Sequence, residues 1–131
     1  MNRSEIEALL SSLYAARIAG DLAALSALFT GDARFEIAGA AQARPILIRA
    51  RGLHEFRPWL ALLIKTFRLT DQRIVTQIID GPKAAVHWHA TVHSRITGTQ
   101  VPTDLIDLVE FDGNGISAYL EFFCATRSPS G

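Results

Sequence analysis

The sequence predicts an α+β domain in which helices near the N-terminus pack on a curved, mostly antiparallel sheet. Apolar residues recur at helical spacing in the first part of the chain, whereas β-rich runs separated by turn residues fill the last part. The length of 131 residues suits one folding unit, because domains usually have about 100–150 residues. We therefore expect a single domain over residues 1–131, with residues 127–131 as a flexible tail.

The N-terminal segment predicts two helices followed by a strand. Ser4 and Glu7 have the spacing of a capping box, and Gly20 is a typical end of a helix. Between them runs an apolar stripe made of Ile6, Leu9, Leu10, Leu13 and Ile18. Asp21 can cap a second, short helix, and alternating residues over 33–39 then predict a strand.

The middle of the chain predicts a loop and a third helix. Residues 40–52 have no clear period, and we expect a loop with a short edge strand there. Residues 53–67 have helical spacing but contain Pro58, which lacks an amide hydrogen and disfavours the helical conformation of Arg57. This helix is therefore expected to begin near Arg57 or to kink there.

The remainder predicts four strands, over residues 68–80, 84–96, 101–111 and 116–126. Turn residues separate them, among them Asp80-Gly81-Pro82 and a turn at residues 97–100. Short connections of this kind join antiparallel neighbours, so the four strands should form a meander.

Composition excludes some classes of function. Thirteen basic and thirteen acidic residues give zero formal net charge, without the basic excess typical of nucleic-acid binding. No apolar run reaches the roughly 18 residues of a membrane helix, and Glu5, Arg17 and Asp21 interrupt any signal-peptide core. One cysteine, Cys124, excludes an intramolecular disulfide. We expect a cytoplasmic protein that uses its 49% apolar residues for a cavity or a subunit interface.

Three of the four histidines fall on one strand. The period of two places His87, His89, Thr91 and His93 on one face, and Val86, Trp88 and Val92 are among the residues on the other. The row can be a solvent-facing polar face, a catalytic or ligand-binding row of imidazoles, or a metal site. A metal site would need further ligands that no motif supplies, so neither a metal nor a cofactor is expected.

Asp107 lies in a predicted strand in which apolar and polar residues do not alternate. The run Asp104-Leu105-Ile106-Asp107-Leu108-Val109 is typical of a strand covered on both faces, and Leu105 and Val109 share the face of Asp107. A carboxyl among such neighbours needs partners or a raised pKa. It can be a structurally hydrogen-bonded aspartate or a pocket acid with a tuned pKa.

Strand register decides whether Asp107 meets the histidines. If the numbers of paired residues add to 196, His89 lies opposite Asp107, and a sum of 198 puts Thr91 there. A sum of 197 would place Asp107 on the other face. The sequence alone leaves these registers open.

The order of elements resembles the nuclear transport factor 2-like superfamily, which includes ketosteroid isomerases and SnoaL-like polyketide cyclases. Residues 14–33 are similar to its first two helices and first strand, and residues 104–115 to the isomerase strand and turn. The resemblance implies a cone-shaped α+β barrel, also described as cystatin-like. Many unrelated activities use this fold, so the fold by itself does not specify the reaction.

The resemblance implies only part of the isomerase site. Asp107 falls where the isomerases hold a protonated acid, but their general base aligns with Ile37 and their tyrosine with Leu13, one residue before Tyr14. His87, His89 and Thr91 fall where the isomerases line their cavity, and Cys124 near a terminal-strand aspartate of some cyclases. Steroid isomerisation by that mechanism is therefore not expected.

The resulting hypothesis is a cofactor-independent dehydratase or isomerase that acts on a hydrophobic carbonyl or ring compound. His89 or His87 would be the general base, oriented by Asp107. Candidate substrate contacts are Tyr14, Arg17, Trp59, Thr91 and Cys124. Core packing is the alternative for Tyr14 and Trp59, and a solvated helix position is the alternative for Arg17. The competing function is a non-catalytic ligand-binding or dimerisation module.

The expected partners are a hydrophobic small molecule and a second copy of the chain. An apolar, uncharged chain with a broad sheet predicts a homodimer through the outer sheet face. Trp88 and Val92, opposite the histidines, would then lie in the interface, together with Phe123 or Tyr119.

Overall fold

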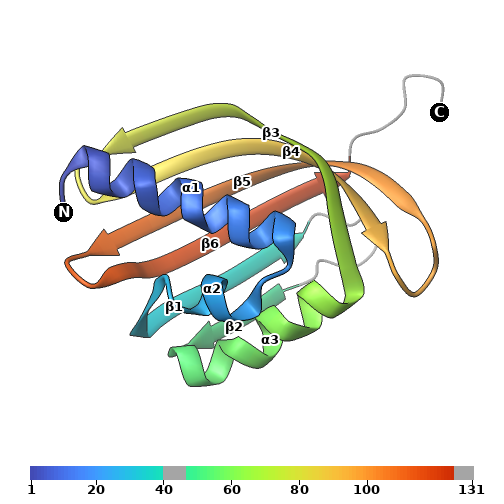
Figure 1. The fold of residues 1–131 in the computed structure, drawn as a ribbon, viewed down its shortest axis with the longest axis horizontal. Helices are drawn as coiled ribbons and strands as arrows, with labels where there is room; N and C mark the ends of the chain where they lie inside the picture. The colour runs from blue at the N-terminus through green and yellow to red at the C-terminus, as the bar shows by residue number, and fades with distance from the viewer. Residues whose placement is uncertain (40–46, 126–131) are drawn as a thin grey trace.

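Three helices cover one face of a six-stranded sheet in the part of the chain that the structure, a computed structural model, describes (Figure 1). The described residues are 1–39 and 47–125. The strand order is β2-β1-β6-β5-β4-β3, and all neighbours are antiparallel except β1 and β6. The sheet is open, with β2 and β3 at its edges. The predicted α+β architecture is confirmed.

Helix α1 (Arg3–Ala19) is capped by Asn2, two residues before the predicted cap Ser4. The Asn2 side chain accepts a hydrogen bond from the Glu5 amide at 2.9 Å, and the Glu5 carboxylate accepts one from the Asn2 amide at 3.2 Å. The prediction that Ser4 and Glu7 form the box is wrong, because Asn2 and Glu5 have the same spacing and asparagine caps as well as serine. Gly20 ends the helix as predicted, in the left-handed conformation.

The predicted short helix and first strand follow. Helix α2 (Leu22–Ser26) is capped by Asp21, whose side chain accepts from the Ala24 amide at 3.0 Å. Strand β1 (Phe29–Gly39) begins four residues before the predicted start, and β2 (Leu47–Arg51) is the short edge strand. The predicted loop at residues 40–46 and the predicted tail at 127–131 lie outside the described residues.

Helix α3 (Leu53–Thr66) begins before Arg57 and contains Pro58, so of the two predicted alternatives the late start near Arg57 is wrong. The amides of Glu55 and Phe56 both donate to the Gly52 carbonyl, at 2.9 and 3.1 Å, and thereby close the first turn. The Phe56 side chain is fully buried, and the free energy gained from its packing offsets the loss of the one hydrogen bond that Pro58 cannot donate.

The last four strands form the predicted antiparallel meander. They are β3 (Phe67–Asp80), β4 (Lys83–Ser94), β5 (Gln100–Asp112) and β6 (Gly115–Ala125). Strand β6 then lies parallel to β1 and joins the N-terminal hairpin to the meander. None of the helices in the described ranges is long and apolar enough to cross a bilayer.

The core lies between the helices and the inner face of the sheet. Phe35 on β1 stacks on Phe56 of α3 and on Tyr119 of β6, with ring centroids 5.2 and 5.7 Å apart. Two carboxyl groups are buried in this apolar layer: Asp107 is 0% exposed and Glu121 is 2% exposed. A buried charge is costly unless it is paired, so Asp107 and Glu121 indicate a candidate functional site.

Candidate functional site

The register of β4 and β5 places Asp107 on the face opposite the histidine row. Val86 pairs with Asp107, and His87 pairs with Ile106, so paired residue numbers add to 193. Directly paired residues share a face, and an odd sum separates Asp107 from His87 and His89. The prediction that Asp107 orients either histidine is therefore wrong.

The connection between the two strands explains this register. The Ser94 amide donates to the Thr99 carbonyl at 2.9 Å, which closes the hairpin earlier than the predicted turn at residues 97–100. The Ser94 hydroxyl also accepts from the amides of Ile96 and Thr97, and Gly98 adopts a φ of 75°. Hydrogen bonds within the turn, rather than the pattern of the strands, therefore fix the register of β4 and β5.

Several predicted site residues lie on the outer face or in solvent. His87 and His89 lie 3.2 and 3.5 Å from the carboxylate of Asp104. Thr91 is on the same face and donates to Asp71 at 3.4 Å. Cys124 is exposed, opposite Asp104 on β6, and Trp59 is 41% exposed on α3. None of these side chains lies beside Asp107 on the inner face of the sheet.

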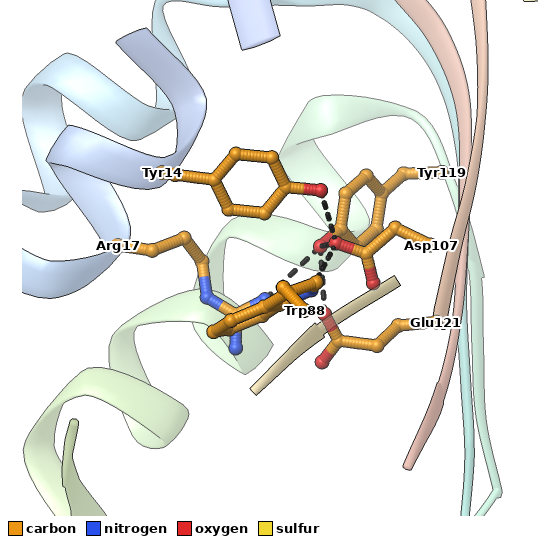
Figure 2. Close-up of polar contacts among 6 residues, drawn as sticks. All are labelled: Tyr14, Arg17, Trp88, Asp107, Tyr119 and Glu121. Atoms are coloured by element: carbon orange, nitrogen blue, oxygen red, sulfur yellow. Dashed lines mark hydrogen bonds and ion pairs between the residues drawn. The ribbon is translucent and has the colours of Figure 1, made fainter. Parts of the chain in front are cut away.

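Tyr14 and Arg17 do point to the inside, where Asp107 is held by three donors (Figure 2). Asp107 Oδ2 accepts from the Tyr14 hydroxyl at 2.7 Å, from Trp88 Nε1 at 2.8 Å and from the Tyr119 hydroxyl at 2.7 Å. Asp107 Oδ1 is buried and has no hydrogen-bond partner within the described ranges. One carboxyl thus joins α1 to strands β4 and β6.

Glu121 extends this arrangement on the neighbouring strand. It pairs directly with Asp107 across β5 and β6. Its Oε2 accepts from Arg17 Nη1 at 2.7 Å and also lies 2.7 Å from the Tyr119 hydroxyl, whose single proton can be donated to either Glu121 or Asp107. The Arg17 guanidinium also lies 5.2 Å from the centre of the Trp88 ring. We call the set Tyr14, Arg17, Trp88, Asp107, Tyr119 and Glu121 the buried network.

The two carboxyls of the buried network have opposite pKa shifts. Burial, and then repulsion from Glu121, raises the pKa of Asp107 well above its ordinary value. Burial alone would raise the pKa of Glu121, but attraction to the Arg17 guanidinium and hydrogen bonds to its carboxylate outweigh burial and lower it. The surroundings of Asp107 therefore favour its protonated form, whereas Arg17 favours the ionised form of Glu121.

The phenols of the network are held in their protonated form. Burial, followed by the nearby Asp107, raises the pKa of both Tyr14 and Tyr119 above the ordinary tyrosine value. Both hydroxyls can therefore donate hydrogen bonds at neutral pH. Such a set of donors, with one neutral acid and one carboxylate, can polarise an oxygen atom and accept a proton. In the described ranges, no group of three or more metal-ligating side chains is arranged to hold an ion.

Two spaces border the network. A cavity of about 20 Å³ lies against Arg17 and Tyr119, and this volume admits about one water molecule. Its other lining residues are apolar: Leu13, Leu25, Phe29, Phe35, Leu60, Leu63 and Ile64. A groove of about 620 Å³ between α1 and β3 includes Tyr14 in its lining. Arg17 and Tyr14 thus connect the buried network to separate spaces.

Sequence reasoning did not assign a site role to Glu121, Tyr119 or Trp88, and assigned the last two to a subunit interface. Trp88 is fully buried and Tyr119 is 2% exposed, so neither can lie on an outer surface. The run Tyr119-Leu120-Glu121-Phe122-Phe123 does carry a signal, because Glu121 is a single acid in an apolar strand, as Asp107 is. This pattern identifies Glu121 as a second acid in an apolar strand, although its pairing with Asp107 depends on the register of β5 and β6.

Comparison with known families gives one match. A family model described as the SnoaL-like domain matches residues 10–119. No curated protein matches the chain at the sequence level.

Solved structures of the same fold cover almost the whole chain. A nuclear transport factor 2-like protein from Burkholderia xenovorans LB400 has a TM-score of 0.75 and 17% identity, covering 94% of this chain and 92% of that one. A protein from Catenulispora acidiphila with a ketosteroid isomerase-like fold, in complex with trimethylamine, has a TM-score of 0.69 and 16% identity, covering 93% and 86%. An LEH-like epoxide hydrolase from M. tuberculosis has a TM-score of 0.69 and 15% identity, covering 88% of this chain and 79% of that one. Identities this low establish the fold alone.

Proposed function

The chain belongs to the SnoaL-like domain family, and we propose that it is a cofactor-independent acid–base enzyme, an isomerase or lyase for a small hydrophobic carbonyl compound. One observation carries this proposal: Asp107 and Glu121 lie directly opposite each other, and their surroundings shift their pKa values apart. Pairs of titratable groups with separated pKa values are typical of sites that perform both acid and base chemistry.

Asp107 is the proposed acid. As a neutral carboxyl next to the hydroxyls of Tyr14 and Tyr119, it can donate a hydrogen bond to a carbonyl oxygen as negative charge develops there. Its buried, unpartnered Oδ1 leaves one position of this carboxyl free to interact with a ligand. Low polarity around the group strengthens such a hydrogen bond.

Glu121 is the proposed base. A carboxylate that Arg17 keeps ionised is a weak base, so it suits only an acidic proton. A proton on the carbon next to a carbonyl becomes acidic when the carbonyl oxygen is polarised, which is the role given to Asp107. Return of the proton to another carbon would be an isomerisation. In a dehydration, the β-hydroxyl would leave as water with the proton that Glu121 had removed from the carbon.

The cavity beside Arg17 and Tyr119 must enlarge to admit such a substrate. Its volume of about 20 Å³ holds one water, whereas ligand sites usually have about 300–1,000 Å³. Leu63 and Ile64 of α3 line the cavity and are only half-buried, so this wall of the cavity is partly exposed to solvent. We propose that the substrate displaces these two side chains and packs on the apolar wall behind them.

Turnover assays with a β,γ-unsaturated ketone and a β-hydroxy ketone test the proposal, and a small aliphatic epoxide tests for a different class of substrate. The epoxide is included because one structural neighbour is named an epoxide hydrolase. Asp107→Asn and Glu121→Gln should each reduce turnover of the active compound at least about 100-fold. His89→Gln is the matched control, because it changes a titratable group on the outer face. Retained activity in Asp107→Asn, or a loss confined to His89→Gln, would contradict the proposal.

A non-catalytic ligand-binding or dimerisation module is the second candidate function. This function is favoured because most polar atoms of the buried network already have hydrogen-bond partners within the network. Within the described ranges, the buried side-chain atoms that lack a partner are Asp107 Oδ1 and the Ser26 hydroxyl. Trp88 lies inside the network, so its fluorescence reports a ligand that enters the site. A change in Trp88 fluorescence without turnover of any of the three compounds would favour this second function.

A further inference from the structure

Helix α3 carries apolar side chains on a side that stays exposed. Phe56 and Leu60 are buried and supply the one apolar face that a surface helix needs for packing on the core. Trp59 and Leu62 are also apolar, although they are 41% and 51% exposed. Their spacing of three residues places them side by side on the helix surface, about 5–6 Å apart. Core packing therefore does not account for these two side chains.

The C-terminal end of α3 lies against the hairpin that joins β4 to β5 (Figure 1). The Arg95 amide donates to the carbonyl of Thr66, the last residue of α3, at 2.8 Å. In this hairpin Ile96 is 79% exposed, the highest value among the large apolar side chains in the described ranges. Phe67, directly after the helix, is 38% exposed. Exposed apolar side chains thus continue from α3 to the hairpin.

Three exposed cations border these apolar side chains. Lys65, Arg68 and Arg95 each lie within three residues of one of them in the sequence. Among the described residues these three form no ion pair, whereas the following cations do: Arg3, Arg17, Arg34, Arg49 and Lys83. Glu55 lies one turn before Trp59, at the end of α3 far from the hairpin. The end near the hairpin is therefore locally basic, although the chain has zero formal net charge.

We propose that this surface binds a membrane that contains anionic lipids. We call the following residues the docking face: Trp59, Leu62, Lys65, Phe67, Arg68, Arg95 and Ile96. Aromatic and aliphatic side chains next to lysine and arginine are typical of elements that lie in the membrane interface. Tryptophan suits the boundary between headgroups and acyl chains, because its ring is apolar and its indole nitrogen donates a hydrogen bond. The cations attract negative headgroups, and they leave no ion pair behind when they bind.

The docking face fits a bilayer better than a folded protein partner. Ile96 stands in a turn and projects, and the cavity and the groove described above include no residue of the docking face in their linings. A fluid bilayer accommodates projecting side chains, whereas a protein interface needs closely matched shapes. A bilayer also dissolves hydrophobic substrates. That last link rests on the proposed function, whereas docking itself does not.

Co-sedimentation of the full chain with lipid vesicles tests docking without any substrate. The vesicles contain phosphatidylcholine alone, or phosphatidylcholine with about 30% phosphatidylserine as the source of negative charge. The wild type should bind the anionic vesicles, bind neutral vesicles at least about 10-fold more weakly, and lose binding as salt is raised. Trp59 fluorescence should shift to shorter wavelengths on binding, whereas Trp88 is already fully buried.

Two variants test the apolar and the charged part of the docking face. Ile96→Asp should weaken binding to anionic vesicles at least about 10-fold, because it replaces an apolar side chain with a carboxylate that the lipid charge repels. Lys65→Gln/Arg68→Gln/Arg95→Gln should weaken binding on the order of 100-fold, because each cation near such a surface contributes about fivefold.

Matched controls change the same residue types elsewhere. Ile78→Asp is the control for the apolar change, because Ile78 is 59% exposed and lies on the order of 30 Å along β3 from Phe67. Arg51→Gln/Arg73→Gln is the control for charge, because neither of these cations forms an ion pair with another described residue. Both controls should bind anionic vesicles as the wild type does.

A wild-type chain that stays in the supernatant with anionic vesicles at millimolar lipid would overturn the proposal and leave the docking face to a protein partner. Equal binding to neutral vesicles, or binding that survives both variants, would also overturn it. Circular dichroism verifies folding, and if Ile96→Asp unfolds, the triple variant decides alone. Docking without turnover would contradict only the proposed function, and turnover without docking would contradict only this inference.

Discussion

Replacing Arg17 with methionine removes the charge that balances Glu121 inside the protein. Arg17 Nη1 lies 2.7 Å from Glu121 Oε2, and their side chains are only 16% and 3% exposed. Methionine keeps the apolar stem that packs near Trp88 and removes the guanidinium. The variant therefore leaves a carboxylate buried without its cation.

The expected loss of stability is large for a single substitution. Breaking a buried ion pair by removing one partner costs about 3–5 kcal/mol, because the remaining charge stays desolvated. Removing the charge of Glu121 as well should restore part of this loss. The double variant Arg17→Met/Glu121→Gln should therefore be more stable than Arg17→Met alone, with a coupling energy of about 2 kcal/mol or more.

Urea denaturation at pH 7 of the wild type, both single variants and the double variant measures this cycle. The surface pair Arg34–Glu110 is the matched control, because its atoms are 3.2 Å apart but its side chains are 62% and 41% exposed. Arg34→Met should cost less than about 1 kcal/mol. A loss in Arg17→Met as small as in Arg34→Met, or strictly additive effects in the cycle, would refute the reasoning.

Three further substitutions test other contacts. Asp107→Asn removes a group whose folded pKa is raised, so the stability advantage of the wild type over this variant should be greatest near pH 4. It should fall by about 1.4 kcal/mol per pH unit as the pH rises toward the folded pKa, in denaturation series at several pH values. Tyr14→Phe removes one of the donors to Asp107 and should cost about 1–2 kcal/mol by urea denaturation; full wild-type stability would contradict the bond. Gly39→Ala places a methyl group on the Phe123 ring and should cost about 1–3 kcal/mol in thermal melts, whereas Gly31→Ala meets no atom within 4 Å and serves as control.

The order of helices and strands could be predicted because it depends on local patterns. Gly20 ended a helical stripe, and Asp21 capped the next helix, as their residue types indicated. The four β-rich runs formed a meander because short turns separate them. The start of α3 could not be predicted in this way, because burial of Phe56 outweighed the local preference set by Pro58.

The arrangement of the site depended on a register that no strand pattern fixes. A change of one in the sum of paired residues moves Asp107 from the histidine face to the Trp88 face. That choice depends on bonds of the Ser94 hydroxyl to the turn, which are not visible in the alternation of β4 and β5. Asp107 was identified from its apolar strand, but its partners on α1 and β6 are far away in the sequence.

The protonation state of Asp107 is the most direct test of the central claim. Carbon-13 NMR of protein labelled at aspartate carboxyls, compared with Asp107→Asn, isolates the signal of this one group. A neutral carboxylic acid at pH 7, with a pKa well above the ordinary aspartate value, is the predicted result. A signal of an ionised carboxylate at pH 7 would contradict the assignment of Asp107 as the acid of the site.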